Sequence, residues 1–249
     1  MRVVSLCPSL TELVYDLGRG DALVGRTKFC VHPADRVAAV PSVGGTKNPK
    51  IDRVVALAPD LVLLNEEENR REDAEALRAA GVACHVSFPK TVAETAAMVR
   101  AIAAALDARE AGERIAADIE GRLARVRARA AGRPLVRWAY LIWRRPWMTV
   151  SGDTFVSAML TAAGGENVFA DRTLRYPTVE PSELAAADPA LVLLASEPFP
   201  FTEHHADELA AATGLPRERF RLVDGELLSW HGSRTACGVD YAAELLQAV

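Results

Sequence analysis

The stretch LAPDLVLL at residues 57–64 decides the fold class of this chain. A short apolar run entered through Pro59-Asp60 is typical of a strand that is buried on both faces of a parallel sheet. The stretch ADPALVLL at residues 187–194 repeats this pattern in the second half of the chain. Helix–proline–strand entries can recur by chance in α/β proteins, but the repeat favours two related α/β lobes.

Strand-like and helix-like segments alternate on both sides of the first stretch. Apolar strands are predicted at residues 3–6, 61–64 and 82–86, and helices at 9–17, 70–80 and 91–106. Ser9, with Glu12 three residues later, predicts a capping box at the first helix. The alternation indicates a mainly parallel α/β lobe over residues 1–106.

The same alternation starts again at residue 132 and predicts a second α/β lobe over 132–249. Strands are expected at residues 135–142, 191–194 and 220–223. Asp153 or Thr154 is expected to cap a helix that ends near Ala163, and a last helix is expected over 241–248.

Residues 107–131 predict one long helix between the lobes. They contain no proline, and an apolar stripe runs along them at helical spacing through Ile115, Ile119, Leu123 and Val126. A helix of this length would span about 37 Å, which is enough to join two lobes. The fold class expected is therefore two Rossmann-like α/β lobes with mainly parallel sheets, joined by one long backbone helix.

Composition excludes several classes of protein. The formal net charge of -4 argues against a nucleic-acid binder that depends on phosphate attraction. The cysteines Cys7, Cys30, Cys84 and Cys237 form no CxxC pair, so a zinc ribbon or a redox motif is not expected. The chain shows no secretory signal and no apolar stretch long enough for a membrane span, which leaves a cytoplasmic protein or a mature form without its leader as alternatives.

Polar and aromatic loops follow the predicted strands. Because ligands bind at the carboxyl ends of the strands in open α/β sheets, these loops are expected to form the binding site. Arginine offers a planar fork for anionic groups, and aromatic rings offer stacking faces. The candidate ligand residues are Arg26, Phe29, Thr46, Lys47, Asn65, Glu67, Trp143, Arg144, Trp147, Tyr176, Glu197, Phe199, Trp230, His231 and Arg234.

Five motifs in order resemble one known family. They are RVVSLCPSLTEL at residues 2–13, Val24-Gly25, the segment 43–45, IDRVVALAPDLV at 51–62 and GGENVFAD at 164–171. The chain is similar to the helical-backbone (class III) substrate-binding proteins of ABC transporters, such as the vitamin B12 and iron-siderophore periplasmic binding proteins. The resemblance covers nearly the whole chain.

The resemblance implies a monomeric, extracytoplasmic receptor and not an enzyme. It implies that a metal chelate such as cobalamin or a ferric siderophore binds between the lobes as ligand, with no cofactor. It also implies docking on an ABC permease through one acidic residue per lobe: Asp52 in the first lobe, and in the second Glu183, which lies one residue after the matching Ser182. Thr46 and Asn65 stand where vitamin B12-binding relatives place aromatic residues, which weakens cobalamin as the ligand.

Two other classes of function stay open at this point. A direct zinc or manganese receptor would use residues such as Cys30, His32, Glu67, Glu197 and His231, although no HExxH or paired-histidine spacing is present. A cytoplasmic binder or a chelatase-like enzyme of the same fold would use Glu66, Glu67 and Glu197 with His231 as acid or base. No GxSxG, GxGxxG or P-loop motif supports catalysis.

Overall fold

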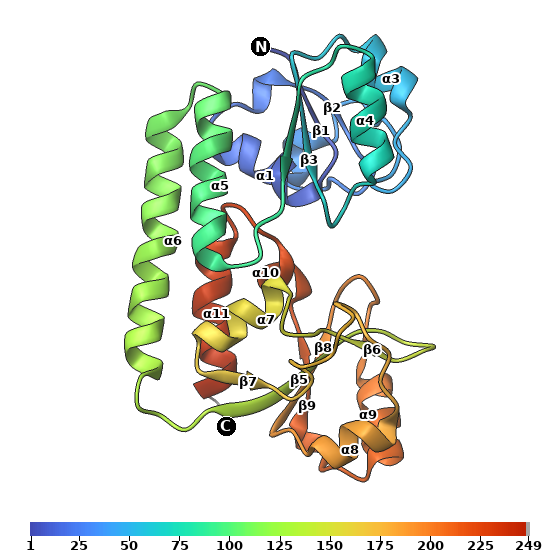
Figure 1. Cartoon of the computed structure of the whole chain (residues 1–249), viewed down its shortest axis with the longest axis vertical. Helices are drawn as coiled ribbons and strands as arrows, with labels where there is room; N and C mark the ends of the chain where they lie inside the picture. Colours follow the sequence, from blue (N-terminus) through green and yellow to red (C-terminus); the bar gives the residue numbers. More distant parts are fainter. Residues whose placement is uncertain (248–249) are drawn as a thin grey trace. The chain divides into compact units, whose positions relative to one another are not determined.

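The computed structural model describes residues 1–247, which divide into two compact units (Figure 1). Unit 1 holds Met1–Pro89, Ala93–Asp118 and His231–Ser233. Unit 2 holds Lys90–Val92, Ile119–Trp230 and the segment that begins at Arg234. The division 1–106, 107–131 and 132–249 drawn from the sequence stays a prediction.

Unit 1 is built on a parallel four-stranded sheet with the order β2-β1-β3-β4. The strands are β1 (Val3–Ser5), β2 (Leu23–Arg26), β3 (Leu61–Asn65) and β4 (Cys84–Ser87). The helices between them are α1 (Pro8–Asp16), η1 (Gly20–Ala22), α2 (Ala34–Val37), α3 (Ile51–Ala56) and α4 (Arg71–Ala79). Buried Val4, Val62, Leu64 and Leu77 belong to one apolar cluster, as the continuous apolar strands require.

Unit 2 is built on a five-stranded sheet with the order β6-β5-β8-β9, in which β7 also pairs with β5. The strands are β5 (Val136–Trp143), β6 (Met148–Thr149), β7 (Gly165–Asn167), β8 (Leu191–Ala195) and β9 (Phe220–Val223). Only the β5–β6 pairing is antiparallel among the described strands. The helices are α7 (Phe155–Ala162), α8 (Pro181–Ala187), α9 (Glu203–Thr213), η2 (Arg217–Arg219), α10 (Gly225–Ser229) and α11 (Thr235–Gln247). These elements confirm the mixed α/β fold with largely parallel sheets.

A long helix stands where the apolar stripe indicated one. It is α6 (Arg109–Ala130), and Ile119, Leu123 and Val126 on the stripe are buried. The boundary between the two units falls inside this helix, after Asp118. In unit 1 its first turns pack closely on α5 (Val92–Ala105), because a Cβ placed on Gly112 would lie 2.2 Å from Cβ of Ala103. Among residues 1–247, no helix combines the length and apolarity that a membrane span needs.

Two helix starts differ from the sequence prediction. The capping box at Ser9 is wrong: α1 begins at Pro8, Cys7 occupies the N-cap position, and Ser9 lies inside the helix. Proline is preorganised for the first helical position, so it takes that position ahead of the serine. The last helix begins at Thr235, six residues before the predicted start at 241; the predicted end, Ala248, lies outside the described residues.

Candidate ligand-binding faces

In unit 1 the loop after β2 carries an exposed aromatic ring. Phe29 is 50% exposed, although most large apolar side chains of the unit are buried. The ammonium of Lys28 lies 4.8 Å from the centre of the Phe29 ring. An exposed ring beside a cation offers a flat apolar face and a positive charge at the carboxyl edge of the sheet.

Arg26, at the end of β2, has a structural task. Its guanidinium donates hydrogen bonds to the carbonyl oxygens of Val37 at 3.0 Å, Val40 at 3.2 Å and Thr27 at 3.1 Å. These bonds fasten α2 and the following loop to the strand. The sequence predicted that Arg26 contacts the ligand, and these three hydrogen bonds go to the protein's own backbone.

Asn65 and Asn69 shape the loop after β3. The Asn65 side chain accepts from the backbone N–H groups of Glu67 and Glu68 at 2.9 and 3.3 Å, and it donates to Ser87 O at 3.0 Å. Asn69 donates to the carbonyls of Leu6 and Thr46, both at 3.0 Å. Asn65 is fully buried, so its side chain supports the loop from the interior of the unit.

The other first-unit candidates lie on or next to this loop. The Lys47 ammonium donates to the carbonyl oxygen of Glu67, and both side chains reach solvent. Thr46 is only 8% exposed. Burial, the largest cause, raises the pKa of the neighbouring Glu68 carboxyl above its ordinary value. Lys47 and Glu67 are therefore better placed than Thr46 and Asn65 to meet a solute.

The thiols of unit 1 stay protonated. Burial, above all other causes, raises the pKa of Cys7 to about 12, and burial also raises the pKa of Cys30. The Cys30 sulfur contacts the hydroxyls of Thr11 at 3.0 Å and Thr27 at 3.2 Å. Metal ligation requires thiolate, which this environment disfavours. Within residues 1–247, no group of three or more histidine, cysteine, aspartate or glutamate side chains could hold a metal ion.

In unit 2 the end of β5 and the loop after β8 form an aromatic cluster. Trp143 is 40% exposed and meets Phe199 edge to face, with ring centres 5.7 Å apart. Phe199 meets Phe201 at 4.8 Å, and Phe201 stacks on Trp147 at 6.1 Å. The inner rings hold Trp143 in position, so unit 2 presents a supported, exposed indole at the carboxyl edge of its sheet.

Two predicted arginines of unit 2 are paired within the protein. Arg144 donates to Glu208 Oε1 at 2.7 Å, and this bond, the largest cause, holds the pKa of Glu208 below its ordinary value. Arg234 donates to Glu226 Oε2 at 2.8 Å and lies 4.9 Å from the centre of the Trp230 ring. Arg144 likewise lies 5.7 Å from the centre of the Trp147 ring. Each arginine thus forms an ion pair with a glutamate and lies beside a tryptophan ring.

Glu197 and the residues near Trp230 are more buried than the sequence suggested. Glu197 Oε1 accepts from Trp230 Nε1 at 2.7 Å and from Ser229 Oγ at 3.0 Å. Trp230 is 8% exposed and His231 is 6% exposed. His231 belongs to unit 1, whereas Trp230 and Arg234 belong to unit 2. The predicted cluster is therefore divided between the two units.

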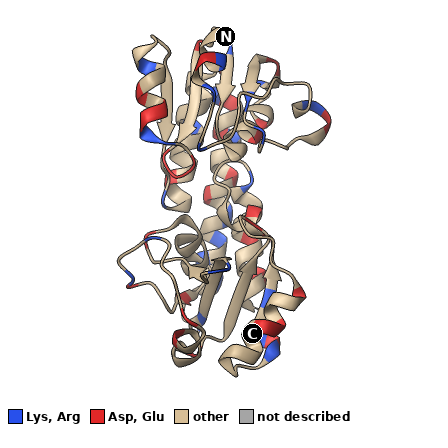
Figure 2. Ribbon diagram, turned by 90° about the vertical axis from the view of Figure 1, so that its right-hand side faces the viewer, with Lys and Arg blue, Asp and Glu red and all other residues tan. Residues whose placement is uncertain are grey.

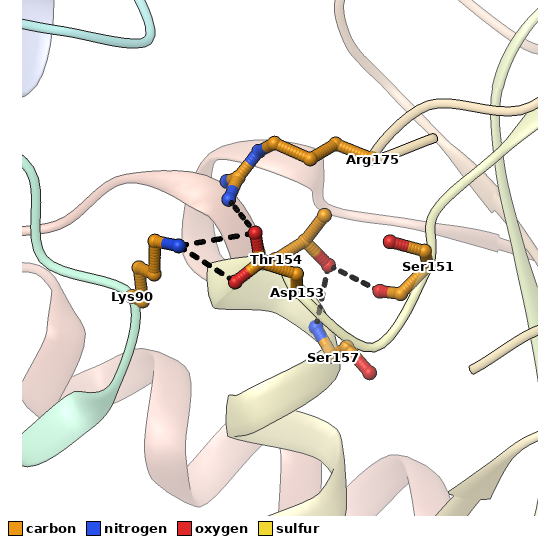
Figure 3. A network of polar contacts seen from close by, with 6 residues as sticks. All are labelled: Lys90, Ser151, Asp153, Thr154, Ser157 and Arg175. Atoms are coloured by element: carbon orange, nitrogen blue, oxygen red, sulfur yellow. Dashed lines mark hydrogen bonds and ion pairs between the residues drawn. The ribbon is translucent and has the colours of Figure 1, made fainter. Parts of the chain in front are cut away.

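A charged triad that was not predicted lies at the start of α7 (Figure 3). Lys90 Nζ lies 2.8 and 3.0 Å from the two carboxylate oxygens of Asp153, and Arg175 Nη1 lies 2.9 Å from Asp153 Oδ2. The hydrogen bond from Lys90, followed by the one from Arg175, holds the pKa of Asp153 below its ordinary value. Arg175 also lies 5.9 Å from the centre of the Tyr176 ring, so the predicted Tyr176 adjoins the triad.

The two residues expected to dock on a permease differ in environment. Asp52 lies exposed in the first turn of α3. Glu183 closes a capping box at α8 by accepting from the backbone N–H of Glu180 at 2.8 Å, and it pairs with Arg172 at 2.5 Å. The bond from Glu180, then that from Arg172, holds the pKa of Glu183 below its ordinary value. Asp52 is thus open to a partner, whereas Glu183 already caps its own helix.

A cavity of about 790 Å³ in unit 2 lies away from all these candidates. It is lined by residues at the starts of β5 and β8, such as Val136 and Leu191, and by the ends of α6 and α11. No candidate ligand residue lines it. Ligands of open α/β sheets bind at the opposite edge, so the strand-end loops are the better candidates.

The two α/β units and their aromatic strand-end loops place this chain among the two-unit α/β binding proteins. Both acidic and basic residues occur along the ribbon of each unit (Figure 2). The chain belongs to the periplasmic binding protein family, which matches residues 3–215.

Individual relatives carry more specific names. The vitamin B12-binding protein of Vibrio parahaemolyticus is 29% identical over 205 residues, which is 82% of this chain and 71% of the relative. Among solved structures, the periplasmic vitamin B12 binding protein of Vibrio cholerae has a TM-score of 0.85 at 23% identity, covering 99% of this chain and 96% of that one. The periplasmic heme-binding protein of Roseiflexus sp. RS-1 has a TM-score of 0.84 at 27% identity, covering 99% and 97%. The resemblance seen in the motifs is confirmed.

Proposed function

We propose that this chain is the substrate-binding protein of an ABC importer and that its ligand is a metal chelate of the cobalamin or haem kind. The observation that carries the proposal is the exposure of one aromatic ring at the carboxyl edge of each sheet: Phe29 at 50% in unit 1 and Trp143 at 40% in unit 2. Large flat ligands are held by such rings, and nearby cations suit their acidic side groups.

The names of the relatives support the ligand class. They include vitamin B12-binding and heme-binding periplasmic proteins, and both ligands are metal chelates built on a macrocycle. The protein then acts by binding and release, without catalysis, in the compartment outside the cytoplasmic membrane. The prediction that the ligand lies between the two lobes stays a prediction, and variants of each unit test each face by itself.

Docking on a permease is the second part of the proposal. Asp52 is exposed on α3 and would contact a basic permease residue. In unit 2 the carboxylate of Glu183 is engaged in its capping box, so it contributes less to docking than Asp52 does. Asp52→Asn is expected to weaken binding to permease in vesicles while ligand affinity stays unchanged; equal permease binding by this variant and the wild type would contradict this assignment.

Ligand screening tests the binding function directly. Purified protein is mixed with haemin, cyanocobalamin and a ferric siderophore, and its melting temperature is recorded. A ligand at a hundredfold excess over its dissociation constant adds about 2.7 kcal/mol of stability, which is easily measured as a shift. Stabilisation by a chelate, and none by its metal salt, is expected. Stabilisation by zinc or manganese alone would contradict the proposal and favour a direct metal receptor.

A further inference from the structure

The charged triad of Lys90, Asp153 and Arg175 brings together three distant segments of the chain. Lys90 follows β4, Asp153 precedes α7, and Arg175 lies in the loop after β7. The Asp153 carboxylate accepts from the lysine through both oxygens and from the arginine through one (Figure 3). Two cations thus converge on one carboxylate group.

These charged groups are accessible to a solute. The side chains of Lys90, Asp153 and Arg175 are 42%, 55% and 25% exposed. The loop that carries Arg175 is fixed by two backbone bonds, from Ser151 N to Arg175 O and from Thr149 N to Pro177 O, both 2.9 Å. Tyr176 lies between those two anchors. The cations are therefore positioned by the backbone beside a candidate ligand residue.

Haem and cobalamin, the two kinds of chelate named above, differ in whether they carry carboxylate groups. Haem carries free carboxylates, whereas the side chains of cobalamin end in amides. A ligand carboxylate could take the place of the Asp153 carboxylate on Lys90 and Arg175, because it offers the same charge and the same two acceptor oxygens. An amide lacks the charge and would leave the ion pairs as they are.

We propose that Asp153 is an internal counter-ion, and that Lys90 and Arg175 recognise a free carboxylate of the bound chelate. The triad then determines how strongly the protein prefers chelates with carboxylates to those with amides. This inference rests on the proposed function, since it assigns a specificity to the same ligand.

The inference is tested with two variants of the triad, one that removes its negative charge and one that removes a positive charge. Asp153→Asn removes the internal competitor, whereas Lys90→Ala removes one of the two cations. Dissociation constants are measured for haemin, for cyanocobalamin, and for a cyanocobalamin monocarboxylic acid in which one side-chain amide is hydrolysed. Glu75→Gln is the matched control, because Glu75 forms an exposed ion pair with Arg71 at 2.8 Å on α4 of unit 1.

Asp153→Asn is expected to tighten binding of the carboxylate-bearing probes about three- to fivefold, as the modest strength of exposed ion pairs allows. Lys90→Ala is expected to weaken binding of the same carboxylate-bearing probes by a similar factor. Neither variant should change cyanocobalamin binding by more than about twofold. Both effects shrink in high salt, which screens exposed charges.

A purely structural role of the triad predicts a different result. Both variants would then change all probes in the same direction, together with the melting temperature. That outcome, or unchanged ratios between the probes, overturns the inference and leaves the proposed function intact. If neither the wild type nor the variants bind any probe, the proposed function and this inference fail together.

Discussion

Ala58 and Asp188 adopt the same left-handed backbone conformation, with φ of 43° and 44°. Each follows a short helix, since Ala58 comes two residues after the end of α3 and Asp188 is the C-cap of α8, and each precedes the proline that leads into a buried strand. The next residues also match: Asp60 N donates to Arg2 O, and Ala190 N donates to Arg137 O, both at 2.8 Å. The sequence repeat is therefore also a repeat of backbone geometry, which supports two related units.

Replacing Ala58 by glycine is expected to stabilise the protein. A residue with a Cβ pays about 1–2 kcal/mol in the left-handed region, and glycine avoids most of that cost. A gain of about 0.5–1 kcal/mol should appear as a higher melting temperature. Asp188→Gly is the matched comparison and should gain less, because aspartate tolerates this conformation and its carboxylate pairs with Arg219. A lower melting temperature for Ala58→Gly would contradict the argument.

Glu197 is expected to matter for stability through Trp230. Glu197→Ala removes the 2.7 Å hydrogen bond that the mostly buried Trp230 indole N–H donates, at a cost of about 1–3 kcal/mol. Glu197→Gln keeps an oxygen at this position and should cost less. Thermal melts followed by tryptophan fluorescence compare the two. Equal melting temperatures for wild type and Glu197→Ala would show that the bond contributes nothing.

Asn69→Ala is expected to disorganise the loop that carries Lys47 and Glu67. The change removes two donated bonds, to Leu6 O and Thr46 O, and the acceptor of Asn65 N at 2.9 Å. Leaving these buried groups unpaired should cost about 2–4 kcal/mol. Asn48→Ala is the control, because Asn48 is an exposed asparagine in a nearby loop. Denaturation curves that coincide for Asn69→Ala and wild type would refute the role given to Asn69.

The stability of unit 2 is expected to depend on pH through His205. Its Nδ1 accepts from the backbone N–H of Thr202 at 3.0 Å, which requires the neutral ring. Burial, followed by the charge of Arg144, lowers the pKa of His205 below its ordinary value of 6.5. The unfolded chain therefore takes up this proton first as pH falls, so stability declines below about pH 6.5.

His205→Gln keeps a hydrogen-bond acceptor for the Thr202 N–H but removes the group that titrates. Melting temperatures measured from pH 5 to 8 should fall less steeply for this variant on the acidic side. The same slope in both proteins would assign the pH dependence to other groups. The pKa values of Asp153, Glu183 and Glu208 are also depressed, by hydrogen bonds from Lys90, from the Glu180 backbone and from Arg144 respectively. The stability that these bonds provide is present at neutral pH and is lost as pH falls through the lowered pKa values.

The sequence predicted the main elements because their signals are local. The runs at 61–64 and 191–194 are apolar over consecutive residues, and the stripe from Ile119 to Val126 has helical spacing. The early start of α11 was missed because Gly238 interrupts the helical pattern. That glycine lets the helix approach α10, since a Cβ there would lie 2.1 Å from Leu227 O.

The candidate site was harder to predict because its partners are remote in the chain. Arg26 and Glu197 have the composition of ligand residues, yet their partners are backbone and side chains that only the fold brings close. Lys90 was overlooked because its partner Asp153 is 63 residues away. Phe29 and Trp143 could be picked out as candidates, since Phe29 follows β2 and Trp143 is the last residue of β5, and ligand residues were expected at strand ends.

Titration of the wild type, Phe29→Ala, Trp143→Ala and the control Leu135→Ala with haemin and cyanocobalamin tests the central claim most directly. Leu135 is 60% exposed but lies at the opposite edge of the unit 2 sheet. The chelate that binds the wild type should bind Phe29→Ala and Trp143→Ala each about tenfold more weakly, and its affinity for Leu135→Ala should be unchanged. Failure of both chelates to bind, or equal affinity in all four proteins, would contradict the account.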